Sequence, residues 1–274
     1  MQNSHKQFAK ELYIFIKKQA LASIFGALLL FVIIITKWIN FDHLFLTRYD
    51  VIFLIAILIQ FILITTGMET WQEVKVIFIF HFLAVVMELF KTNPSIASWQ
   101  YPDKPGIFML STVPLFTGFL YSSVGSYIAR AWKIFKLHFT NFPPLKHLAI
   151  FSFLAYLNFF THHYFIDIRW LLFIIAFFML HQTKVHFTMI KTPRTMPLLL
   201  GLLLITSFLY LAENIGTIMK VWLYPNQTGS WHLVRFGKFG SWFLLIIISF
   251  TLVSFVYKDI FNNNQKNNLK KSTT

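Results

Sequence analysis

The sequence predicts an all-α, polytopic membrane helix bundle with about eight transmembrane helices. Hydrophobic residues make up 57% of its 274 positions and charged residues only 12%, whereas soluble domains average about a quarter charged residues. Apolar runs long enough to cross the roughly 30 Å hydrocarbon core recur along the chain. The net charge is +14, but Lys and Arg are scattered between these runs. We therefore expect no nucleic acid partner, since that would require a clustered basic face.

Eight runs have the length of a membrane-spanning helix, which needs about 20 residues. They cover approximately 20–37, 50–66, 75–91, 107–129, 147–163, 168–186, 197–217 and 239–257. Pro114 lies inside the fourth run and predicts a kink there. We interpret residues 1–258 as a single transmembrane bundle and residues 259–274, rich in Asn and Lys, as a disordered cytoplasmic tail.

The basic residues predict the orientation of the bundle. With the N-terminus inside, sixteen Lys and Arg fall on inner segments and eight on outer segments, which agrees with the positive-inside rule. The first apolar run ends without a small-residue cleavage site, so we expect a retained span rather than a cleaved signal peptide. The expected location is the cytoplasmic membrane, with multiple passes and with both termini cytoplasmic. The chain has no cysteine, which excludes disulfides and cysteine-ligated metals.

The most informative feature is a sequence motif that occurs twice, and each copy is called a phrase below. Each copy has a glutamate, a threonine one turn later and a Trp-x-Tyr-Pro motif after the predicted helix. The copies are Glu88, Thr92 and 99–102, and Glu213, Thr217 and 222–225. They end the third and seventh spans, an even number of spans apart, so they point the same way. This predicts a parallel repeat of four plus four helices, with halves at about 20–132 and 147–257.

Glu88 and Glu213 are the predicted catalytic residues, because an ionisable group within a span is by default a candidate functional site. Solvation by lipid headgroups remains an alternative for glutamates this close to the interface, and an aromatic belt remains one for Trp and Tyr. The predicted substrate-binding residues are polar and aromatic side chains near the outer ends of spans. They are Trp99, Tyr101, Asn158, Tyr210, Asn214, Thr217, Trp222 and Tyr224.

His162 and His163, near the same boundary, are the candidate metal ligands. With Glu88 and Glu213 they would form a chemically reasonable site for zinc, manganese or iron. Their spacing matches no standard metal motif, so the cofactor stays unknown. Arg169 is expected to pair with the nearby Asp167.

Two further features, one in an inner loop and one within the fourth span, have simpler interpretations. Glu69 and Glu73 could form a paired site, but a solvated helix N-terminus that favours negative charge explains them more simply. Gly118, Ser122 and Ser126 form a small-residue ridge that would let another helix approach closely.

Several short sequence segments together resemble the bacterial YoaT-like integral membrane family. They lie at 67–71, 87–92, 98–102, 125–132, 158–163 and 212–217. The resemblance covers roughly residues 50–257, with Ala97 where we expect a glycine. It implies a bacterial membrane protein and brings no established activity.

Three functions fit these observations. The first choice is an acid/base membrane enzyme acting on a lipid or isoprenoid-type apolar substrate, in which aromatic rings stabilise a developing cation. The alternatives are a proton-coupled transporter of a small solute and a non-catalytic membrane scaffold. The expected partners are the lipid bilayer and a lipid or isoprenoid ligand, while the oligomeric state stays open.

Overall fold

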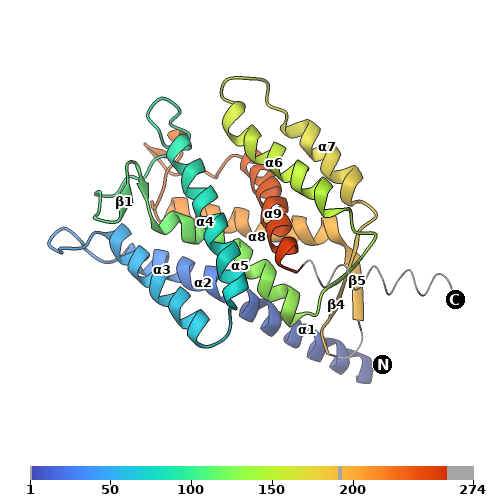
Figure 1. Cartoon of the computed structure of the whole chain (residues 1–274). Helices are drawn as coiled ribbons and strands as arrows, with labels where there is room; N and C mark the ends of the chain where they lie inside the picture. Colours follow the sequence, from blue (N-terminus) through green and yellow to red (C-terminus); the bar gives the residue numbers. More distant parts are fainter. Residues whose placement is uncertain (1, 191–192, 258–274) are drawn as a thin grey trace.

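The computed structural model describes residues 2–190 and 193–257, which form a bundle of helices with two small β-sheets (Figure 1). The predicted tail, 259–274, lies outside the described residues. The helices are α1 (Gln2–Ala22), α2 (Ile24–Thr36), α3 (Arg48–Thr65), α4 (Trp71–Lys91), α5 (Phe116–Ile134), α6 (Leu145–Thr161), α7 (Arg169–Leu180), α8 (Leu198–Ile218) and α9 (Gly237–Val256). The chain is therefore mostly helical, as predicted.

Local sequence signals set where several helices begin. Thr47 and Thr70 cap α3 and α4, each in a capping box with an acid three residues later, Asp50 or Glu73. In such a box the two side chains satisfy backbone N–H groups that a helix start would leave unpaired. Pro144 and Pro197 directly precede α6 and α8, where a missing N–H costs no helical hydrogen bond.

Two predicted helical runs are partly β-structure. The fourth run, 107–129, begins with the hairpin of β1 (Met109–Leu110) and β2 (Val113–Pro114). Pro114 therefore precedes α5 and kinks no helix, so the predicted kink is wrong. The sixth run, 168–186, is helical only to Leu180, because the chain then turns into a strand.

A three-stranded antiparallel sheet lies at the end of the bundle that the charge pattern predicts to be cytoplasmic. Its order is β3 (His138–Thr140), β4 (Lys184–Thr188) and β5 (Pro193–Pro197). The sheet joins the α5–α6 connection to the α7–α8 connection. Helix α1 is attached to it, since Lys18 Nζ donates to the Thr188 carbonyl at 2.8 Å. An ion pair of 2.7 Å also links Glu11 to Arg194.

Three helices, α3, α8 and α9, are long and apolar enough to cross a membrane. A fourth candidate is the pair α1 and α2, which is bent by 71°. Helix α7 has 12 residues, or about 18 Å at 1.5 Å per residue, which is shorter than the hydrocarbon core. The predicted count of eight spans is therefore not confirmed by helix length and composition.

Helix α9 is the central element of the bundle and packs against α4, α5, α6 and α8 (Figure 1). Its middle is buried, from Phe243 to Phe250. The outer surface is apolar as well, with Phe61, Phe78 and Phe208 at 61%, 73% and 73% exposure. Apolar residues both inside and outside are typical of a bundle in apolar surroundings.

The small-residue ridge packs as predicted. Gly118, Ser122 and Ser126 are all buried on α5. Gly118 lies against the His81 ring of α4, and a Cβ added there would meet that ring at 2.4 Å. The ridge thus lets α4 and α5 approach closely, which positions the carboxylates described next.

Candidate functional site: two carboxylate cages

Glu88, in the last turn of α4, is buried inside a cage of aromatic donors. Trp99 Nε1 and the Tyr101 hydroxyl donate to its Oε2 atom at 2.8 and 2.7 Å. The Tyr121 hydroxyl of α5 donates to Oε1 at 2.7 Å. Three of roughly four acceptor positions on the carboxylate are therefore used.

Glu213, near the end of α8, is buried in a second cage of the same kind. Trp222 Nε1 donates to Oε1 at 3.0 Å, and the Tyr224 hydroxyl donates to the same atom. Trp242 Nε1 of α9 donates to Oε2 at 3.2 Å. Each glutamate thus receives a Trp and a Tyr from its own phrase on one oxygen, and an aromatic donor from the next long helix on the other.

The two phrases also share their backbone form. Ala97 and Lys220, each two residues before the Trp, adopt positive φ angles of 45° and 55°. This region is costly for residues with a Cβ, which explains why a glycine is expected at position 97. The backbones of Gln100 and Leu223 exchange two hydrogen bonds, at 2.9 and 2.8 Å.

The cages contact each other through their aromatic walls. The Trp99 and Tyr224 rings meet edge to face at 6.2 Å, and the Tyr121 and Trp242 rings stack at 5.6 Å. Burial and then the neighbouring glutamate charge raise the pKa of Tyr101 and of Tyr224 well above the ordinary value. Both phenols therefore stay protonated and keep donating near neutral pH.

Lys238, in the first turn of α9, brings a positive charge to both cages. Its Nζ atom lies 4.1 Å from the centre of the Trp99 ring and 4.6 Å from that of Tyr224. The negative charges of Glu213 and Glu88 both act on it. The pair of cages therefore combines two carboxylates with one ammonium.

The structure brings four of the predicted substrate-binding residues together: Trp99, Tyr101, Trp222 and Tyr224 all lie in the cages. Three further predicted substrate-binding residues, Tyr210, Asn214 and Thr217, lie on α8. Their side chains form hydrogen bonds with the loop that follows this helix. The Tyr210 hydroxyl donates to the Val234 carbonyl, and Asn214 Oδ1 accepts from Val234 N at 2.9 Å. Thr217 Oγ1 accepts from Trp231 Nε1 at 3.1 Å.

Asn158 lies apart from the cages, in a polar cluster that joins α6 to α7. Its side chain donates to Asp167 at 3.1 Å and accepts from the backbone N–H of Ile168 at 3.2 Å. Arg169 pairs with Asp167 at 2.5 Å, as predicted. Asn158 thus fixes the turn between the two helices.

His162 and His163 follow the end of α6 and face Lys91. The Lys91 ammonium lies 3.4 Å from His162 Nε2 and 2.7 Å from His163 Nε2. Burial, and then the charge of Lys91, lower the pKa of His162 to about 4. Across the described ranges no group of three or more His, Cys, Asp and Glu could hold a metal ion. The metal site stays a prediction, and its two imidazoles here accept from a lysine.

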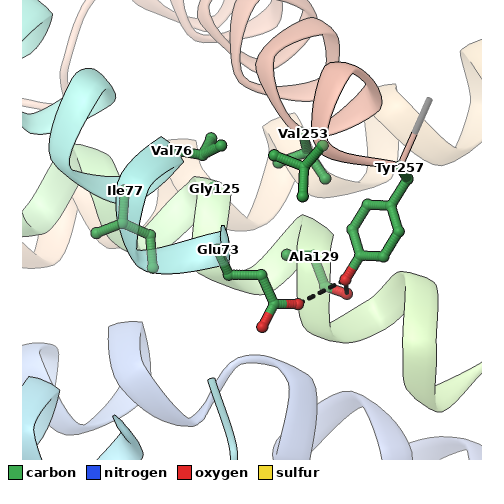
Figure 2. Close-up of a pocket in the computed structure, with 8 residues that line it drawn as sticks. Glu73, Val76, Ile77, Gly125, Ala129, Val253 and Tyr257 are labelled. Carbon is green, nitrogen blue, oxygen red and sulfur yellow. Dashed lines mark hydrogen bonds between the residues drawn. The ribbon is translucent and has the colours of Figure 1, made fainter. Parts of the chain in front are cut away.

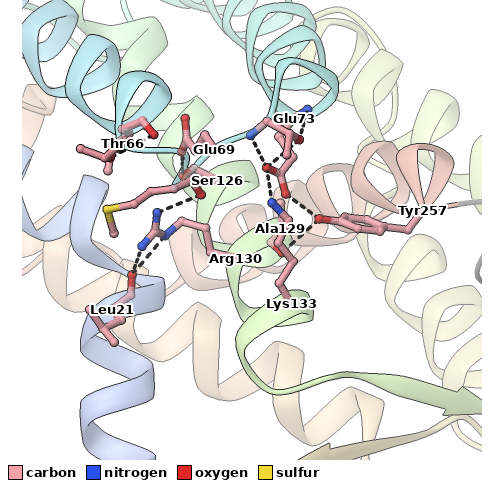
Figure 3. A network of polar contacts seen from close by, with 12 residues as sticks. Leu21, Thr66, Glu69, Glu73, Ser126, Ala129, Arg130, Lys133 and Tyr257 are labelled. Carbon is pink, nitrogen blue, oxygen red and sulfur yellow. Dashed lines mark hydrogen bonds and ion pairs between the residues drawn. The ribbon is translucent and has the colours of Figure 1, made fainter.

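A second polar network lies at the other end of α4 (Figure 3). Glu73 accepts from Lys133 at 2.6 Å and from the Tyr257 hydroxyl at 2.5 Å, besides its capping contacts with Thr70. Glu69 accepts from Gln60 and Ser126. Both glutamates are only 3% exposed, so the expected solvated helix start is wrong, although Glu73 does cap α4.

Arg130 completes the second network without forming an ion pair within the described part of the chain. Its guanidinium donates to the Leu21 carbonyl at 2.6 Å and to the Met68 carbonyl at 3.3 Å. It thereby joins the end of α1 to the segment before α4 (Figure 3).

Two recesses lie between the helices. Glu73, Gly125 and Tyr257 contribute to the walls of the first, which measures about 200 Å³ (Figure 2). The second measures about 250 Å³, and its lining includes Tyr121 and Tyr156. Neither recess is lined by Glu88 or Glu213.

Sequence reasoning missed Tyr121, Trp242 and Lys238. Tyr121 and Trp242 are each the sixth residue of their helices, α5 and α9. A comparison of the two repeat halves that continued past the Trp-x-Tyr-Pro motifs into the next long helix would have aligned these two aromatic residues. Lys238 has no counterpart at the start of α5, so only the fold reveals it.

These features define a class: a mostly helical protein with three or four candidate membrane spans and two buried, aromatic-caged glutamates. The chain belongs to the family described as "Protein of unknown function (DUF817)", whose model matches residues 11–250. The Uncharacterized protein YoaT of Bacillus subtilis (strain 168) is 40% identical over 237 residues, which cover 86% of this chain and 88% of that protein. No solved structure matches the chain.

Proposed function

We propose that this protein is a proton-coupled transporter of a small solute in the bacterial cytoplasmic membrane. The observation that carries the proposal is the pair of matched carboxylate cages. Transporters built from internal repeats place their substrate and coupling-ion sites where the repeats meet. Two glutamates beside one ammonium leave one negative charge uncompensated, which a proton or a cationic solute can neutralise.

The proposal includes eight spans in two parallel halves, with both termini cytoplasmic. Three observations support a two-fold relation between the halves: the shared phrase geometry, the backbone pairing of Gln100 with Leu223 and the packing of the helices. Helix α4 of the first half packs against α6 of the second, and α8 of the second packs against α2 of the first.

Helix α4 also carries a further ionisable group, His81, which lies about 10.5 Å from Glu88 along the helix. No hydrogen bond to the His81 ring occurs in the described part of the chain, and the ring packs against Phe119 at 4.8 Å. An imidazole without a hydrogen-bond partner is suited to exchange a proton on a route to Glu88.

The geometry supports an acid/base enzyme less well. A general acid or base needs hydrogen-bond reach to its substrate, whereas each cage already supplies three donors to its glutamate. The recess nearest to Glu88 is separated from it by Tyr121, which lines that recess and donates to the carboxylate. A lipid or isoprenoid substrate would have to displace these donors.

The test is proton movement in proteoliposomes that contain a pH-sensitive dye. Amines, amino acids, sugars and organic acids are added outside one class at a time. We expect at least one class to change the internal pH with the native protein and not with Glu88→Gln or Glu213→Gln. Asp42→Asn, at an exposed acid outside the cages, is the control that should behave as native. If no class moves protons, the transporter proposal is wrong.

A further inference from the structure

The ammonium of Lys238 is held in an unusual way. It lies over two aromatic rings, at 4.1 Å from the centre of Trp99 and 4.6 Å from that of Tyr224. Within residues 2–190 and 193–257 it forms no hydrogen bond and no ion pair within 4.0 Å. Lys238 is thus bound by ring faces, although two carboxylates lie nearby.

The reason is that the carboxylates direct their hydrogen bonds elsewhere. Trp and Tyr donors occupy Glu88 and Glu213 (Trp99 Nε1 at 2.8 Å and Trp222 Nε1 at 3.0 Å, for example). The negative charges still act on Lys238, but from the edges of the rings, where these donors lie, and not from their faces. The result is a box with aromatic walls and a negative field.

This chemistry selects a particular kind of cation. Ring faces attract ammonium groups that have few or no N–H donors to satisfy. Hard metal ions such as Mg²⁺ and Ca²⁺ instead need direct oxygen ligands, which the caged carboxylates do not offer freely. Anions would be repelled by the two glutamates.

We propose that the box of Trp99, Tyr224, Glu88 and Glu213 binds the cationic group of an organic ammonium ion, and that Lys238 is the tethered occupant which this ligand displaces. The inference rests on the proposed transport function and names its substrate class. Lysine carries its charge on a flexible four-carbon stem. Lys238 lies in the first turn of α9, and rotation about its stem moves the ammonium out of the box without movement of the helix.

The test measures binding of tetramethylammonium to the full chain in detergent by titration calorimetry, with no gradient and no transport. We expect Lys238→Met to bind this probe at least about tenfold more tightly than the native protein, because it removes the competing ammonium, a difference of about 1.4 kcal/mol. Lys238→Gln should act in the same direction, which guards against a folding defect peculiar to one variant. Lys104→Met, at an exposed lysine, should bind as native.

A second substitution locates the probe. In the Lys238→Met background, Trp99→Leu or Tyr224→Leu should weaken binding by about tenfold or more, since each removes one ring face. Unchanged affinity in both Lys238 variants, or tightened binding that neither ring substitution weakens, would overturn the proposal. Proton movement driven by sugars or acids but not by amines would leave the transporter standing and refute this substrate class.

Discussion

The two ends of α4 hold their buried carboxylates differently. At one end Glu73 has a direct cationic partner, Lys133 at 2.6 Å, together with a helix cap. At the other end the Glu88 carboxylate accepts from three neutral aromatic donors, and Lys238, whose charge acts on it, contacts rings. Glu73 is therefore charge-compensated where it lies, whereas the charge at the cages depends on what else binds there. The first arrangement suits structural support and the second suits ligand or proton binding.

The largest expected effect is on stability, at Glu73. Glu73→Gln should lower the free energy of unfolding by about 3 kcal/mol, the lower end of the cost of breaking a buried ion pair, because Lys133 is 38% exposed. Denaturation in mixed detergent micelles measures it. Glu11→Gln is the matched control: its partner Arg194 is 53% exposed, so the loss should be below about 1 kcal/mol. Equal losses in the two variants would show that Glu73 is not a supporting residue.

A smaller effect tests whether the cages are equivalent. Trp99→Phe and Trp222→Phe each remove one indole donor to a carboxylate, which costs about 1–2 kcal/mol of unfolding free energy. We expect similar losses from both in the same micelle assay, since the two donors occupy matching positions. A loss confined to one variant would argue against a two-fold relation between the halves.

The smallest effect concerns pH, at the cluster of His162 with Lys91, His163 and Arg169, because His162 is only half-buried and solvent screens its charge. The pKa of His162 falls from its ordinary value of 6.5 to about 4, so the unfolded chain binds the proton more readily. Stability from this group is complete above pH 6.5 and is lost as the pH falls through 4. Thermal unfolding should therefore shift to lower temperature over this range, and less so in His162→Gln. His147→Gln, at an exposed histidine, should keep the native pH profile.

The sequence was sufficient to predict the helical class and to single out both glutamates. Acids are rare in the apolar runs, and a repeated Trp-x-Tyr-Pro motif marks their surroundings. It could not reveal Tyr121 and Trp242 as partners, because aromatic residues are abundant in every run of this chain. The strand Lys184–Thr188 was missed for a similar reason: Val185 and Phe187 continue the apolar run of α7, and strand pairing depends on β3 and β5.

The metal ligands show a further limit of sequence reasoning. His162 and His163 share a boundary with Glu88 in the linear pattern, but the fold places the Lys91 ammonium against their Nε2 atoms. Lys91 ends the same helix as Glu88, three residues later, and its side chain contacts a different neighbour. A shared depth along the spans therefore did not predict which of these side chains meet.

The most direct test of the central claim, that the caged glutamates exchange a proton, is infrared difference spectroscopy of the purified protein during a pH titration. Protonated carboxyl groups and carboxylates absorb at different infrared frequencies, so the measurement distinguishes the two forms. We expect a carboxyl band that forms as the pH is lowered, that is lost in Glu88→Gln or Glu213→Gln, and that persists in Asp42→Asn. A band unchanged by both cage substitutions would contradict it.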